Sequence, residues 1–159
     1  MKPVFGRGRS CAVAAVALCL AGQAAAQSAS NTVCEAIRGT ITPVCNAAIC
    51  NQGTVSGDLR GRFNTRTTSI YPAGSGWLYT AWLRIELDGG EGILEMVNEG
   101  FAPRDAQGGP DLAQGTEVLT VSETTRGKYQ DYTGTIVSSG AHATGRPTAF
   151  TGRLCHKVR

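Results

Sequence analysis

The sequence predicts an all-β protein, a single antiparallel β-barrel of about eight strands closed by disulfides, for three reasons. Beyond residue 53 the chain consists of short alternating runs separated by Gly, Pro, Asp and Asn, which is typical of antiparallel strands. No segment holds the 3.6-residue period of an amphipathic helix. The chain contains 21 glycines, and glycine supplies the sharp bends that a small barrel requires at its corners. Closure also removes the exposed strand edges that an open sheet must protect.

The first 26 residues have the pattern of a secretory signal peptide. Three basic residues, Lys2, Arg7 and Arg9, precede a short apolar run at residues 11–20, and small residues follow at 24–26. This run is too short to cross about 30 Å of bilayer hydrocarbon. We therefore expect an exported protein, periplasmic or extracellular, without a membrane anchor. The predicted organisation is a signal peptide at 1–26, a Cys-rich segment at 27–52 and a barrel domain at 53–159.

The charges argue against a nucleic-acid partner. The chain has 15 Lys and Arg against 12 Asp and Glu, but three of the basic residues lie in the signal peptide, so the remainder has no net formal charge. Proteins that bind nucleic acids present a clustered surplus of Lys and Arg. No phosphate-binding loop, metal-ligand spacing or cofactor motif occurs either, and the sequence leaves the oligomeric state open.

Four cysteines follow the signal peptide: Cys34, Cys45, Cys50 and Cys155. An even number in an oxidising compartment predicts two disulfides with three alternative connectivities, and the spacing matches no common zinc site. Because only Cys155 is distant, any complete pairing ties the C-terminal segment to the region 34–50. If the strand that begins near residue 53 neighbours the last strand, Cys50 lies beside Cys155. We therefore favour Cys50–Cys155 and Cys34–Cys45.

The first predicted strand covers residues 54–63, where apolar and small residues alternate with charged ones. Residues 77–87 form the clearest strand, with every odd position apolar. Its polar face is interrupted by Leu78 and Trp82, so we expect a loop or a neighbouring chain to cover part of that face. The turn Asp88-Gly89-Gly90 then leads into a returning strand at 92–101.

Residues 102–115 form a long loop with two prolines, and loops of this length are uncommon in compact domains unless they cover something. Four further alternating segments follow, at 116–125, 127–133, 134–139 and 149–156. The count is seven or eight strands.

The second half of the chain resembles a known group of barrels. Residues 115–140, GTEVLTVSETTRGKYQDYTGTIVSSG, and then AFTGRL at 149–154 resemble the "GTGxY…A…G" stretch of the allene oxide cyclase and dirigent-like barrel group. The likeness covers about a quarter of the exported chain and departs at Arg126, where the family has a small residue. It implies an eight-stranded antiparallel barrel with an apolar cavity. Plant relatives bind oxylipins for cyclisation or guide the coupling of phenolic radicals. No catalytic residue of the family aligns with a position in this chain.

The residues offer two weak catalytic candidates, Glu95 and Glu99. They share one face of the strand 92–101, while Leu94 and Met96 share the other. If the glutamates line a cavity, their pKa values are raised and suit proton transfer. We favour the opposite arrangement, in which Leu94 and Met96 face the core, because buried unpaired carboxylates are costly.

An aromatic set consisting of Tyr71, Trp77, Tyr79 and Phe101 is the candidate lining for an apolar ligand, although aromatic residues are more often plain core. The leading functional hypothesis is therefore a secreted barrel that binds an apolar or phenolic small molecule. The alternatives are a cyclase or isomerase using the same cavity, and an interaction module whose barrel is solidly packed.

Overall fold

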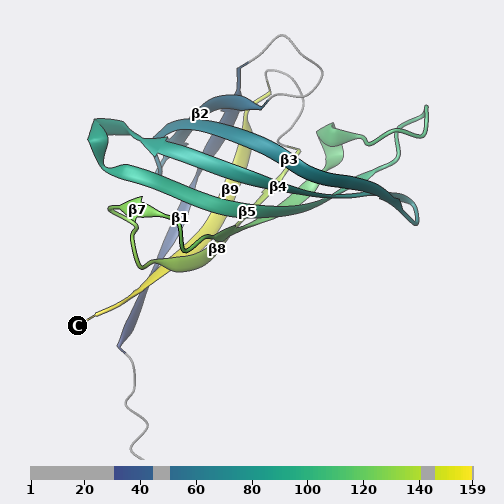
Figure 1. The fold of residues 1–159 in the computed structure, drawn as a ribbon. Coiled ribbons are helices and arrows are strands. Elements are labelled where there is room, and N and C mark those ends of the chain that lie inside the picture. Colours follow the sequence, from purple (N-terminus) through teal and green to yellow (C-terminus); the bar gives the residue numbers. More distant parts are fainter. Residues whose placement is uncertain (1–30, 45–50, 141–145, 159) are drawn as a thin grey trace, which may run out of the picture.

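The structure, a computed structural model, describes residues 31–44, 51–140 and 146–158. The expected signal peptide, Cys45 and Cys50 lie outside these ranges. The described chain forms one nine-stranded sheet (Figure 1). Its strands are β1 (Thr32–Pro43), β2 (Gln52–Gly57), β3 (Gly61–Ala73), β4 (Gly76–Leu87), β5 (Gly92–Pro103), β6 (Thr116–Val121), β7 (Arg126–Gly127), β8 (Thr133–Ser139) and β9 (Thr148–Lys157). Two short 3₁₀ turns, η1 (Asp88–Gly90) and η2 (Leu112–Gln114), lie in the connections.

The strand pairings close on themselves. The order along the sheet is β4-β3-β2-β1-β9-β8-β6-β5, and β4 also pairs with β5, so eight strands form a ring. Every pairing is antiparallel, and β7 adds a short pairing at the start of β5. The predicted all-β, antiparallel fold is confirmed. In Figure 1 the paired strands β1 and β9 run together, oblique to the long strands β3, β4 and β5.

The ring begins earlier in the sequence than expected. Strand β1 lies within the segment 27–52, which the sequence analysis separated from the barrel domain, and it pairs with β2 and β9. Its buried residues Ile37 and Ile41 alternate with more exposed positions, but Gly39 between them hides the alternation. A side chain at Gly39 would collide with the backbone of Ser56 and the ring of Phe150, so glycine is required for this close approach.

One disulfide joins Cys34 to Cys155, which are directly opposite each other in the β1–β9 register. The favoured connectivity, Cys50–Cys155 with Cys34–Cys45, is therefore wrong. The physical reason is that β1, and not the strand near residue 53, is the neighbour of the last strand. The broader expectation that a disulfide ties the C-terminal segment to the region 34–50 is confirmed.

The predicted strand 54–63 is divided into β2 and β3. Gly57 has a positive φ of 113°, which L side chains rarely adopt, and the chain turns over the next residues. The backbone N–H of Asp58 donates to the Arg38 carbonyl at 3.0 Å, and its carboxylate accepts from the Arg38 N–H at 2.9 Å. After this turn, β3 begins at Gly61 and extends to Ala73. The predicted strand 127–133 is mostly turn: within it, only Gly127 at the end of β7 and Thr133 at the start of β8 are paired.

The core is built from the inward-facing residues of the ring. Along β4, Tyr79, Ala81, Leu83, Ile85 and Leu87 are buried, as the alternation predicted. The other buried members of the core come from all around the ring and its turns: Ile37, Ile41, Val55, Leu59, Phe63, Leu94, Met96, Leu119, Tyr129, Ile136, Phe150 and Leu154. The outward-facing residues of the same strands form the outer surface of the ring.

Candidate functional site

The space among the core side chains is almost filled. A void of about 10 Å³ remains between residues of β1, β2, β4, β6, β8 and β9, lined by apolar side chains such as Leu59 and Phe150. Ligand pockets for small organic molecules have volumes of roughly 300 to 1,000 Å³. This void is therefore about thirty times too small to hold a small organic ligand.

The four aromatic residues proposed as a ligand lining do not lie together. Tyr79 points into the ring and is buried, whereas Tyr71 and Phe101 lie on the outward face and are 50% and 38% exposed. Trp77 is partly buried, and its indole N–H donates to the Gly108 carbonyl at 3.1 Å. Arg104 lies 5.9 Å from the centre of the Trp77 ring. Trp77 thus anchors the loop after β5 and faces no shared cavity with the other three.

The two candidate glutamates lie on the outer side of β5. Leu94 and Met96 are fully buried, so the arrangement that the sequence analysis favoured is the observed one. Glu95 is 3.8 Å from the Arg84 guanidinium and accepts a hydrogen bond from the Thr124 hydroxyl. Glu99 is exposed. Neither carboxylate stands in an apolar cavity.

A buried carboxylate that the sequence analysis did not select lies on the inner side of β6. Glu117 is 3% exposed, and its two carboxylate oxygens accept hydrogen bonds from the Ser138 hydroxyl at 2.6 Å and from the Asn98 amide at 2.5 Å. Burial first, and then the nearby Glu117 carboxylate, raises the pKa of the Tyr79 phenol above its ordinary value. The alternation of residues 117, 119 and 121 was the available signal, because it places this carboxylate on the same face as Leu119.

The Glu117 carboxylate receives hydrogen bonds from within the core, whereas the side-chain oxygen of Asn98 is buried without a hydrogen-bond partner. Ser138 and Asn98 each give one donor, and both residues are themselves almost fully buried. Such an arrangement compensates the cost of placing a carboxylate in the interior. We therefore assign the cluster a structural role.

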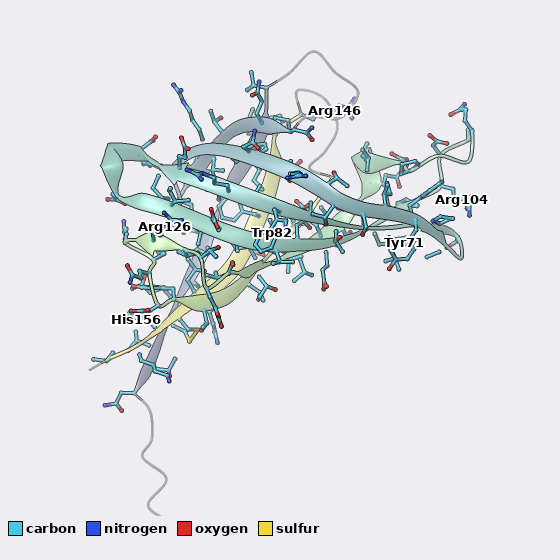
Figure 2. All side chains as sticks on the ribbon, viewed as in Figure 1. Tyr71, Trp82, Arg104, Arg126, Arg146 and His156 are labelled. Atoms are coloured by element: carbon cyan, nitrogen blue, oxygen red, sulfur yellow. A yellow bond between two sulfur atoms is a disulfide. The ribbon has the colours of Figure 1, made fainter. Side chains whose placement is uncertain are left out.

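Six large apolar side chains are exposed in a region of the outer surface that spans five consecutive strands of the ring, β3, β4, β5, β6 and β8. We call this region the outer apolar patch, and its members are Tyr71, Leu78, Trp82, Phe101, Val118 and Val137, each 38 to 50% exposed. The register places Tyr71 beside Leu78 and Leu78 beside Phe101. Val118 lies beside Val137 on the neighbouring strands. Figure 2 shows Trp82 partway along the long strands and Tyr71 nearer their far end, where Arg104 also lies.

Two charged groups belong to this patch. Glu99 lies between Thr80 and Val118 in the register, and Phe101 is two residues further along the same strand. Arg66 lies beside Trp82 at the patch edge. Within the described part of the chain, neither side chain has an ion-pair or hydrogen-bond partner. The nearby hydroxyl of Thr80 is instead engaged by Thr68 at 2.6 Å and by Ser69 at 2.8 Å.

Two surface grooves lie outside the patch. The larger, of about 420 Å³, is bordered by residues including Arg62, Arg84 and Glu86, and Arg84 is already 3.2 Å from Glu86. The smaller, of about 240 Å³, is bordered by Lys128 and Glu91, which form an ion pair at 2.8 Å. Each groove is therefore bordered by one ion pair, Arg84–Glu86 in the larger and Lys128–Glu91 in the smaller.

Comparisons with known proteins assign no relative: no family model, curated protein or solved structure matches the chain. Among the described residues, no group of three or more His, Cys, Asp or Glu side chains is arranged to hold a metal ion. Within the same residues, no helix is long and apolar enough to cross a membrane.

Proposed function

We propose that this protein is exported, folds into a disulfide-linked β-barrel, and acts as a protein-interaction module through the outer apolar patch. The signal-peptide pattern at 1–26 supports export. The Cys34–Cys155 disulfide is of the kind that persists in oxidising compartments. The nearly filled interior favours the packed-barrel hypothesis over the two hypotheses that require a cavity.

The outer apolar patch is the observation that carries this proposal. Single exposed apolar residues are ordinary on protein surfaces, but here six lie on five consecutive strands of the ring, and Tyr71, Leu78 and Phe101 are direct cross-strand neighbours, as are Val118 and Val137. From their exposed fractions, the six side chains present roughly 500 Å² together, if a large apolar side chain offers about 200 Å² in total. The largest apolar patch on a typical soluble monomer is roughly 300 to 600 Å² and is often functional, so this patch is of the size at which a functional surface is common.

The form of the patch favours a protein over a small molecule or a lipid surface. It is the outer face of a sheet, whereas small-molecule sites are concave and bury most of their ligand. The Glu99 carboxylate lies within it, and placing an unpaired carboxylate in hydrocarbon costs several kcal/mol. A protein partner can cover the apolar side chains and also supply a cation for Glu99.

Site-specific photocrosslinking in the cell that exports the protein tests this function. A photoreactive amino acid at Leu78 should form protein adducts, and the same group at Thr54, an exposed position on β2 outside the patch, should form few. The added substitution Trp82→Lys should reduce adduct formation at Leu78 at least fivefold. Equal adducts at Leu78 and Thr54, or none at either position, would overturn the proposal. An adduct only to a small molecule would support the ligand-binding alternative instead.

A further inference from the structure

We propose that the larger surface groove binds a small hydroxylated carboxylate, such as a sugar acid, and that Arg62 holds its carboxylate. The groove, of about 420 Å³, lies over β2, β3 and β4, which are adjacent strands of the sheet (Figure 1). Its volume lies within the range of small-molecule pockets, whereas that of the interior void does not. None of its described lining residues belongs to the outer apolar patch, so this site goes beyond the proposed protein interaction and is independent of it.

The polar lining of the groove comes from two adjacent cross-strand rows on the outer face. The first row consists of Thr54, Arg62 and Glu86, and the second of Gln52, Asn64 and Arg84. All six residues are exposed. With strand spacings of about 4.8 Å and a rise of about 3.4 Å per residue, their backbone positions cover an area of about 10 Å by 7 Å. Six polar side chains are thus close enough to contact one small ligand.

Among the described residues that line the groove, Arg62 is the cation without a carboxylate partner. Its cross-strand neighbour Glu86 lies 3.2 Å from Arg84 instead, and Arg84 is also 3.8 Å from Glu95. All 12 Asp and Glu residues of the chain lie within residues 31–44, 51–140 and 146–158, and none of them forms an ion pair with Arg62. The Arg62 guanidinium can therefore bind an external anion without losing an internal one.

The charges around Arg62 favour a ligand with a single negative charge. The planar guanidinium matches a carboxylate group with two parallel hydrogen bonds. A phosphate monoester carries a charge of about −1.5 to −2 at neutral pH. Only one unpaired cation is available here, and the neighbouring Glu86 carboxylate would repel the excess charge of a phosphate. We therefore assign a monocarboxylate to the groove.

The remaining side chains of the groove favour hydroxyl groups on the rest of the ligand. Gln52, Thr54 and Asn64 each carry both a donor and an acceptor, and within the described part of the chain their side chains have no hydrogen-bond partner. Phe63, the aromatic residue of the described lining, is only 6% exposed and offers little apolar surface. A ligand that combines one carboxylate with several hydroxyls, as a sugar acid does, matches this set of groups.

Two-dimensional ¹⁵N–¹H NMR of the exported, oxidised protein, titrated with glucuronate, tests the inference. The backbone amide signals of Thr54, Arg62 and Asn64 should shift and saturate with a dissociation constant of about 1 mM, the affinity that a ligand of this size reaches at ordinary ligand efficiency. Glucose has a hydroxymethyl group in place of the carboxylate, and acetate has a carboxylate without the hydroxyls. Each should bind at least tenfold more weakly than glucuronate.

Two variants separate the groove from the general charge of the surface. Arg62→Gln should raise the dissociation constant of glucuronate at least tenfold, because it removes the guanidinium that holds the carboxylate. Arg66→Gln is the matched control: Arg66 is exposed on the same face of β3 and also lacks an ion-pair partner among the described residues, but it does not line the groove. It should change the dissociation constant less than twofold. Unchanged amide signals far from each substitution verify that the fold is retained.

Four results would overturn the inference. The first is the absence of any shift at ten times the expected dissociation constant. The second and third are binding of glucose or of acetate as tight as that of glucuronate, which would remove the carboxylate or the hydroxyls from the recognition. The fourth is an equal loss in Arg62→Gln and Arg66→Gln, which would attribute the binding to surface charge and not to the groove.

Discussion

Replacing both Cys34 and Cys155 by Ser should lower the free energy of unfolding by about 5 kcal/mol. The two residues are separated by 121 positions and join the first and last strands of the ring. In the unfolded chain the disulfide closes a loop of that length, and the loop-closure entropy at 25 °C corresponds to about 5 kcal/mol. Cys34 is exposed, so little apolar burial is lost with its sulfur. The effect should therefore come from the crosslink itself.

Urea unfolding followed by tryptophan fluorescence measures this effect, with the wild type kept oxidised. Domains of this size are stable by only about 5 to 15 kcal/mol, so the variant should unfold at a much lower urea concentration. The slope of the transition should increase, because the unfolded state becomes less compact. Ala36→Ser, a substitution at an exposed position on β1, controls for serine in a strand and should change stability by less than about 0.5 kcal/mol.

A loss of less than about 1 kcal/mol in the double variant would refute this reasoning. It would mean that the unfolded chain already keeps its ends close together, so that the crosslink removes little entropy. If Ala36→Ser lowered the free energy of unfolding as much as the double variant does, the effect would belong to the β1 substitution and not to the disulfide.

Three further predictions concern the interior. Leu94→Ala removes a fully buried side chain from the core and should cost about 2 to 5 kcal/mol in urea unfolding, because the surrounding residues cannot fully collapse; a cost below about 1 kcal/mol would contradict the packed interior. Ser138→Ala removes a hydroxyl donor from the buried Glu117 carboxylate and should cost about 1 to 3 kcal/mol, whereas Ser139→Ala at the exposed neighbouring position should cost almost nothing. Because the pKa of Tyr79 is raised in the folded state, the folded protein keeps that proton above pH 10 while the unfolded chain releases it. Stability should therefore be unaffected below about pH 10 and fall as the pH rises above it, and Tyr79→Phe should reduce this alkaline dependence in unfolding measured from pH 8 to 11; an unchanged dependence would assign the effect to another group.

The candidate site was only partly predictable from the sequence. The alternation along residues 77–87 placed Leu78 and Trp82 on the polar face and predicted that a loop or another chain covers part of it. The structure shows both side chains exposed, and it adds Tyr71 and Phe101 beside them. Alternation along one strand gives the face of each residue, but only the cross-strand register shows which residues from different strands become neighbours.

Two of the four aromatic residues proposed as a ligand lining illustrate the same limit. Tyr71 and Tyr79 belong to that set, yet they lie on opposite faces of the sheet. A bulge between Thr67 and Ser69 shifts the register of β3 before Tyr71 is reached. An inserted residue reverses the face of everything after it, and no composition or spacing argument locates it in advance.

By itself, the sequence determined the secondary-structure class and the inward face of the clearest strand, because a period of two residues follows from backbone geometry alone. It also determined that a disulfide ties the C-terminal segment to the cysteines at 34–50, since only Cys155 is distant from the others. Only the tertiary structure decided that Cys34 is the partner of Cys155, that Glu117 is buried, and that six exposed apolar side chains lie on the outer side of five consecutive strands. Each of these depends on which strands become neighbours when the ring closes, and that choice arises from packing among residues far apart in the chain.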